Sequence, residues 1–98
     1  MHGNRNANRR PHHLYVIKDR VDESVLKYGI SSEPIDEDGL SKRVRIQLQI
    51  LNIGAGWLRY TGKIIMENIP DRTTAKQIEE KYISHYSQQH GRRPRGNK

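Results

Sequence analysis

The stretch HLYVIKD, His13–Asp19, decides the fold. It is a short run of apolar and aromatic residues, and a second such run, VLKYGIS, follows at Val25–Ser31. The segment between them, Arg20–Ser24, is polar and has the composition of a turn. Two runs of this kind around a polar turn are typical of antiparallel strands joined by a short loop, so the sequence predicts a β-hairpin.

Side-chain alternation assigns the residues of the first strand to two faces. Leu14 and Val16 are expected on one face, and Tyr15 and Ile17 on the other. Tyr15 is therefore expected to meet one of the residues just before Gly29 across the ladder.

Length and composition limit the remaining possibilities. The chain has 98 residues, 33% of them hydrophobic, and no cysteine, which fits one small domain without disulfides or cysteine-bound metal. It has no apolar run of about 18 residues and no cleavable export signal. A membrane-spanning protein is therefore not expected.

The formal net charge of +7 is concentrated at the two ends of the chain. Residues 1–13 and 91–98 contain no acid, whereas acids and bases balance in between. The basic residues of the ends are Arg5, Arg9, Arg10, Arg92, Arg93, Arg95 and Lys98. Such ends attract polyanions without reading sequence, which indicates a nucleic-acid partner, with solubility of the chain as the alternative.

Residues 1–12 are rich in Asn and almost free of apolar side chains. They are expected to form a flexible arm, and residues 13–98 the folded domain with its basic tail. A starting Met before such a linker suggests a fragment of a longer protein.

The middle of the chain is harder to interpret. An acidic loop is expected at Ser32–Gly39, because Pro and Gly interrupt it. Leu40–Leu51 fits both periodicities, since its apolar residues alternate as in a strand and also recur at helical spacing, and the pattern by itself slightly favours a strand. A loop at Asn52–Gly56 and a strand at Trp57–Ile69 follow, and Gly62 within that strand is expected to mark a weak point or bulge.

The last element is a predicted amphipathic helix that starts after Pro70 and ends at Gly91 and Pro94. Its candidate caps are Asp71, Thr73 and Thr74, and its apolar face comprises Ala75, Ile78, Tyr82, Ile83 and Tyr86. At about 100° per residue, Glu79 falls within that face and Glu80 points to solvent. A carboxylate in a buried face needs a partner, namely a metal ion, a basic residue or water.

These residues resemble the GIY-YIG nuclease family, also called the URI domain, from about His13 to the C-terminus. Leu14-Tyr15 resembles the first half-motif, and Lys27-Tyr28-Gly29 falls on the second. Leu40–Val44 resembles the following helix and places the family's arginine at Arg43. Ile78–Ile83 resembles the metal-binding helix and Pro94–Asn97 the closing Pro-x-x-Asn, which place the metal-ligand glutamate at Glu79 and the asparagine at Asn97.

The chain departs from the family pattern at three points. His13 occupies the first glycine position, next to Tyr15. Lys27 stands where the second tyrosine is expected, so that role passes to Lys27 or to Tyr28. The acidic segment before Arg43 is longer than usual, which leaves Arg45 as a rival for the arginine role.

The resemblance implies an α+β fold in which helices flank a small three-stranded antiparallel sheet, in the order β-β-α-β-α. It thereby makes Leu40–Leu51 a helix. It also implies an endonuclease that hydrolyses DNA with one Mg²⁺ or Mn²⁺ ion on Glu79. The expected site residues are Tyr15, Lys27, Tyr28, Arg43, Glu79, Asn97 and His13, with Arg45, Arg92, Arg93 and Arg95 binding the nucleic-acid backbone.

Among GIY-YIG proteins, the chain is most similar to the URI-type toxin domains at the C-terminal ends of bacterial polymorphic toxins, including Rhs and contact-dependent inhibition proteins. That similarity implies delivery into the cytoplasm of a competing bacterium as part of a larger secreted protein, and a cognate immunity protein in the producing cell. Two alternatives stay open: a basic nucleic-acid-binding module without catalysis, and a metal-independent RNase toxin.

Overall fold

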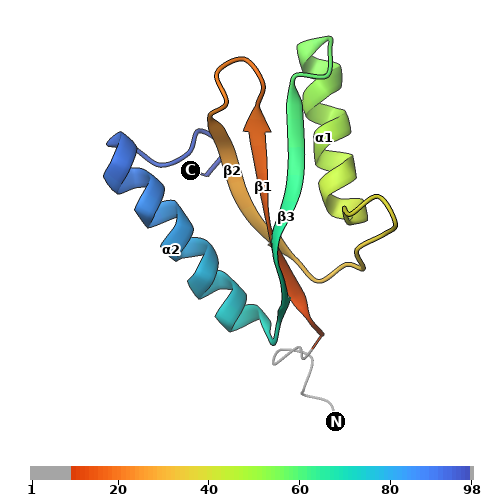
Figure 1. Ribbon diagram of the computed structural model, residues 1–98, viewed down its shortest axis with the longest axis vertical. Coiled ribbons are helices and arrows are strands. Elements are labelled where there is room, and N and C mark those ends of the chain that lie inside the picture. The colour runs from red at the N-terminus through yellow and green to blue at the C-terminus, as the bar shows by residue number, and fades with distance from the viewer. Residues whose placement is uncertain (1–9, 98) are drawn as a thin grey trace.

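The computed structural model describes residues 10–97. Its three strands form one antiparallel sheet in the order β2-β1-β3, and α1 and α2 cover opposite faces of it (Figure 1). The elements in chain order are β1 (His12–Asp19), β2 (Val25–Ser31), α1 (Lys42–Ala55), β3 (Tyr60–Ile69) and α2 (Arg72–His90). The predicted α+β fold and its β-β-α-β-α order are confirmed.

The central strand β1 separates two small hydrophobic cores. Leu14 is fully buried in the core beneath α2, where it clusters with Ala75. Tyr15 and Ile17 are buried on the other face, where they cluster with Val44 of α1. The alternation predicted for the first strand is therefore confirmed, and one strand supplies both cores.

The start of β1 differs from the expected domain boundary. His12, assigned to the flexible arm by sequence, is the first residue of β1 and is only 3% exposed. Residues 1–9 and Lys98, which include Arg5 and Arg9 of the basic ends, lie outside the described residues.

The helix implied for Leu40–Leu51 exists, but α1 begins later and extends further than expected. The loop predicted at Asn52–Gly56 was wrong, because the helix continues to Ala55. Gly56 ends it in the left-handed conformation (φ 81°), where its N–H bonds to the carbonyls of Asn52 and Ile53. A glycine in this conformation is a common helix stop.

The strand predicted from Trp57 starts only at Tyr60. The Asn52 side chain holds that start: its Oδ1 accepts the Tyr60 N–H at 2.7 Å and its Nδ2 donates to the Tyr60 carbonyl at 3.2 Å. Gly62 is not a bulge, since it pairs regularly with Ile17. A Cβ on Gly62 would lie 2.9 Å from Val44, so the glycine lets α1 lie close to the sheet.

The predicted last helix is confirmed as α2. Of the three candidate caps, Asp71 is the one used: its carboxylate accepts the Thr74 N–H at 2.8 Å. Gly91 ends the helix with φ 74°. Within residues 10–97, neither helix has the length and apolar content that crossing a bilayer requires.

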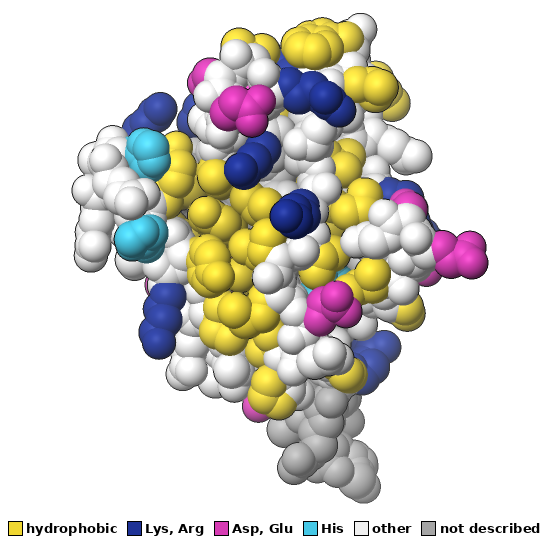
Figure 2. Space-filling view, viewed as in Figure 1, with side chains coloured by type: hydrophobic (Ala, Val, Ile, Leu, Met, Phe, Trp, Pro, Cys, Tyr) yellow, Lys and Arg dark blue, Asp and Glu magenta, His cyan; other side chains and the backbone are white. Residues whose placement is uncertain are grey.

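β3 forms one edge of the sheet, and its side chains are mostly half-buried. Figure 2 shows hydrophobic side chains gathered along the middle of the face that carries β3 in this view. The opposite edge is β2, and the polar residues expected to carry function lie along that edge.

Candidate active site

A cavity of about 310 Å³ opens along β2, with residues of α1 and α2 on its walls. Residues of β1, β2, the loop that follows β2, α1, α2 and the C-terminal segment contribute to it. Six of the seven expected site residues line it: Tyr15, Lys27, Tyr28, Arg43, Glu79 and Asn97. The fold thus brings together residues that only a resemblance had linked.

Tyr15 reaches this cavity across a glycine. It pairs with Gly29 of β2, and a Cβ built on Gly29 would lie 2.3 Å from the Tyr15 ring and hydroxyl. The tyrosine is only 1% exposed, so its ring is held by the core while its hydroxyl faces polar neighbours. Gly29 is therefore required because the phenol occupies the space of its side chain.

Gln47 of α1 holds the Tyr15 hydroxyl and was missed by sequence reasoning. Its Oε1 accepts a hydrogen bond from Lys27 Nζ at 3.1 Å, and its Nε2 donates to the Tyr15 hydroxyl oxygen at 2.7 Å. Since an ammonium can only donate, the lysine fixes which end of the amide faces the phenol. The Tyr15 proton therefore stays available for another acceptor. A sequence signal existed: Gln47 lies one helical turn after Arg43.

α2 contributes one carboxylate and two basic side chains to the cavity. Glu79 is half-buried and makes no hydrogen bond or ion pair with the described residues. Glu80 is exposed and accepts a hydrogen bond from Arg93 at 3.3 Å, so the predicted orientations of the two glutamates are confirmed. Arg72 and Lys76, also missed by sequence reasoning, line the cavity on the same helix.

Asn97 acts on the backbone of Tyr28. Its Oδ1 accepts the Tyr28 N–H at 2.8 Å and its Nδ2 donates to the Tyr28 carbonyl at 2.9 Å. The Tyr28 ring packs against Tyr82 with ring centroids 5.4 Å apart, and burial raises the pKa of its phenol. Tyr28 is therefore protonated at neutral pH and can donate a proton but not accept one. Asn97 is a positioning residue that fixes the edge of β2.

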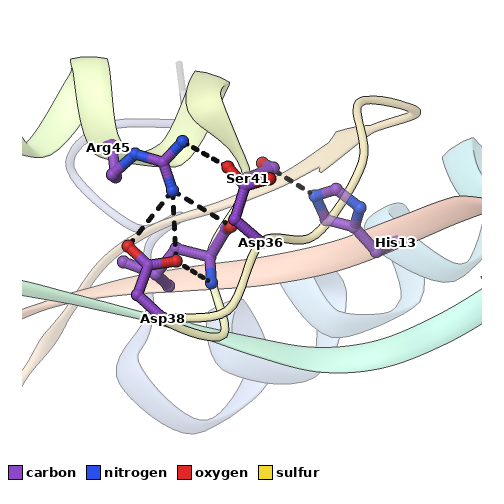
Figure 3. A network of polar contacts seen from close by, with 6 residues as sticks. His13, Asp36, Asp38, Ser41 and Arg45 are labelled. Atoms are coloured by element: carbon purple, nitrogen blue, oxygen red, sulfur yellow. Dashed lines mark hydrogen bonds and ion pairs between the residues drawn. The ribbon is translucent and has the colours of Figure 1, made fainter.

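His13 differs from expectation, because it does not line this cavity. It is 3% exposed, and its Nε2 lies 3.2 Å from Oγ of Ser41, the residue that precedes α1 (Figure 3). Burial lowers the pKa of His13, which favours the neutral ring. The side chain thus joins β1 to the start of α1, and His12 is the histidine on the cavity wall.

The geometry separates the two rival arginines. Arg45 donates to Asp38 at 3.1 Å and pairs with Asp36, which folds the acidic loop onto α1 (Figure 3). Its charge is therefore compensated, and it lies outside the cavity. Arg43 lines the cavity, and it has no ion pair among the described residues.

The C-terminal arginines expected to bind nucleic acid are partly engaged within the chain. Arg93 donates to the carbonyl of Asn97 at 3.0 Å. Arg95 donates to Asp19 at 3.0 Å, and Arg59 forms a second ion pair with this carboxylate at 2.8 Å. Hydrogen bonding to Arg59 holds the pKa of Asp19 well below its ordinary value of 3.8. Arg95 is thus a structural ion-pair partner, whereas Arg92 forms no ion pair with the described residues.

Comparison with known proteins adds one finding. A family model described as URI fold toxin 2 matches residues 5–91. Neither a curated protein nor a solved structure matches the chain significantly. The matched range contains every cavity residue except Asn97.

Proposed function

The chain belongs to the URI fold toxin 2 family, and on that basis we propose that it is a toxin that hydrolyses DNA phosphodiester bonds with the help of a divalent metal ion. One observation carries the proposal. The unpaired Glu79 carboxylate shares a polar cavity with the phenol of Tyr15 and the guanidinium of Arg43. A phosphodiester hydrolase needs a metal ligand, a group that orients water and a cation for the developing charge, and these three side chains supply them.

The donor set fits Mg²⁺ or Mn²⁺ held through Glu79. The described residues, 10–97, contain no group of three or more His, Asp or Glu side chains placed to hold a metal ion together. Mg²⁺ commonly binds through one or two carboxylates together with waters and substrate phosphates. When bound, such an ion acts as a Lewis acid on the scissile phosphate.

The protein groups have separate tasks in the reaction. The oxygen of a water molecule attacks phosphorus, one P–O ester bond breaks, and the products are a phosphate monoester and a hydroxyl. Tyr15 orients this water, because Gln47 already donates to the phenol oxygen and leaves the phenol O–H free to donate to the water oxygen. To accept the proton of the water, Tyr15 would first have to lose its own. Arg43 and Lys27 stabilise the negative charge that develops on the phosphate.

Membership in a toxin family supports two further parts of the proposal. The domain is delivered into a target cell, where its DNA is the substrate, and a cognate immunity protein protects the producing cell. An immunity protein that covers the cavity along β2 would block substrate access directly.

The test is incubation of the purified protein with supercoiled plasmid and with total RNA, in Mg²⁺, in Mn²⁺ and in EDTA. We expect plasmid cleavage that requires the metal and is lost in Glu79→Gln. Glu80→Gln is the matched control, because this neighbouring carboxylate is exposed and lies outside the cavity. We expect it to cleave at the wild-type rate.

Other outcomes would reject the proposal in favour of a specific alternative. An intact plasmid combined with a salt-sensitive gel shift indicates a binding module without catalysis. Loss of RNA in EDTA indicates a metal-independent RNase. Equal loss of cleavage in Glu79→Gln and Glu80→Gln would contradict the assignment of Glu79 as the metal ligand.

A further inference from the structure

Three side chains of α2 point in a common direction along the cavity. Arg72, Lys76 and Glu79 follow one another at spacings of four and three residues. At about 100° per residue, they fall within about 60° of each other around the helix axis. All three line the cavity, with Arg72 at the first residue of α2. They therefore form a row that leads from the carboxylate to the start of the helix.

The two basic side chains of this row carry uncompensated charge. Neither Arg72 nor Lys76 forms an ion pair with the described residues, and both are exposed. Elsewhere in the chain Arg45, Arg59 and Arg95 are each paired with a buried or loop carboxylate. Among the described residues, the cavity is lined by two carboxylates, Glu33 and Glu79, and by four cations, Lys27, Arg43, Arg72 and Lys76. The excess of cations favours an anionic ligand that is longer than one phosphate group.

We propose that Lys76 and Arg72 form a phosphate subsite that binds two successive phosphates of the DNA strand on one side of the scissile phosphate. The inference rests on the proposed function for the position of the scissile phosphate at Glu79. With a rise of about 1.5 Å per residue, Lys76 lies about 4.5 Å and Arg72 about 10.5 Å along the helix from Glu79. Lys76 and Arg72 have long side chains, so they can contact successive phosphates of an extended strand.

The subsite would fix the direction in which the bound strand leaves the scissile bond. The bound strand leaves the scissile bond along α2 towards Arg72, whereas the other two cations of the cavity, Arg43 and Lys27, come from α1 and β2. Because contacts to phosphates carry no base information, this subsite orients the strand without selecting a sequence. The enzyme then requires DNA that continues past the cleaved bond on the α2 side.

The test is the affinity for a short fluorescein-labelled DNA duplex, measured by anisotropy in EDTA over a range of salt concentrations. Each phosphate contact makes the plot of log affinity against log salt concentration steeper by about 0.9. At about 0.15 M salt, each contact raises the affinity about fivefold. We expect Arg72→Gln and Lys76→Gln each to lose about fivefold and about one unit of slope. The double variant should lose roughly 30-fold.

Lys81→Gln is the control for net charge, because Lys81 is exposed on α2 and lies outside this cavity. We expect its affinity and salt slope to stay at the wild-type values. In plasmid cleavage, Arg72→Gln and Lys76→Gln should raise KM and leave kcat unchanged. General damage to the fold would not raise KM alone. Circular dichroism spectra test whether each variant is folded.

Two results would overturn the subsite. One is a salt slope that stays at the wild-type value in both variants. The other is an equal loss in Lys81→Gln, which would mean that only total charge matters. The binding test of the subsite is independent of the cleavage test of the proposed function. A wild-type protein that binds the duplex through Arg72 and Lys76 but never cleaves plasmid would keep the subsite and reject the nuclease.

Discussion

Gly29→Ala adds a methyl group where the Tyr15 ring now lies. The added Cβ would be 2.3 Å from Cζ and Oη of Tyr15 and 2.8 Å from its Cε1. Non-bonded carbon atoms sit at about 3.5 Å or more, so the ring would have to retreat by about 1.2 Å. Tyr15 is 1% exposed and packs with Ile17 and Val44, which leaves little room behind it.

Both stability and activity should therefore fall. Overfilling a packed core costs about 1 to 3 kcal/mol, which for a domain of this size lowers Tm by roughly 5 to 20 °C. A displacement of about 1 Å at a reacting group can reduce kcat by about 100-fold. Thermal unfolding followed by circular dichroism and metal-dependent plasmid cleavage measure the two effects on the same preparation.

Gly54→Ala is the matched control. Gly54 lies within α1, and a Cβ there meets nothing within 4 Å. Replacing an exposed helical glycine with alanine is expected to add up to about 1 kcal/mol of stability and to leave cleavage unchanged. A Gly29→Ala protein that melts and cleaves like the wild type would refute the placement of Tyr15 over Gly29. A less stable protein with unchanged kcat would refute the catalytic role of the phenol.

Three further variants test other contacts of the site and fold. Tyr15→Phe keeps the ring and removes the hydroxyl, so it should fold normally and lose cleavage, and wild-type kcat would contradict the role of Tyr15. Gln47→Leu removes the hydrogen bonds of the Gln47 amide to Lys27 and to the Tyr15 hydroxyl. We expect kcat to fall about tenfold at unchanged Tm. An unchanged kcat would mean that packing of the ring alone positions the phenol. The ion pairs of Asp19 lower its pKa in the folded protein below the ordinary value of 3.8. They therefore stabilise the folded state fully at pH values above 3.8, and this stabilisation is lost as the pH falls towards the folded-state pKa. Asp19→Asn should therefore be less stable at pH 7 and lose less stability on acidification, as measured by urea unfolding across pH, and parallel pH curves for the two proteins would contradict this.

The hairpin and α2 were predictable from the sequence because their signals are local. Apolar runs around a polar turn gave β1 and β2, and a capping residue with helical periodicity gave α2. The helix α1 was not decided by its pattern, because three of its isoleucines face solvent. Ile46, Ile50 and Ile53 are 43%, 65% and 80% exposed, so apolar residues occur all round the helix and mimic strand alternation.

The residues that line the cavity could be predicted where a family motif carried them, but not where their position depends on contacts with distant parts of the chain. Arg72 and Lys76 line the cavity, and Gln47 reaches the Tyr15 hydroxyl, because of how the helices lie on the sheet. The position of His13 outside the cavity has the same origin, since its neighbour Ser41 is 28 residues away in the chain. Charge counting also treated Arg95 as free, because its partner Asp19 is remote in sequence.

The double role of β1 links correct folding to activity. Leu14 and Tyr15 are neighbours in the chain, yet they enter different cores on opposite faces of the sheet. A slip of β1 by one residue would exchange these faces, removing Leu14 from its core and Tyr15 from the cavity at once. A chain misfolded in this register would be both unstable and unable to place its phenol, so the proposed cleavage activity of a preparation would report the fraction of molecules with the native strand register.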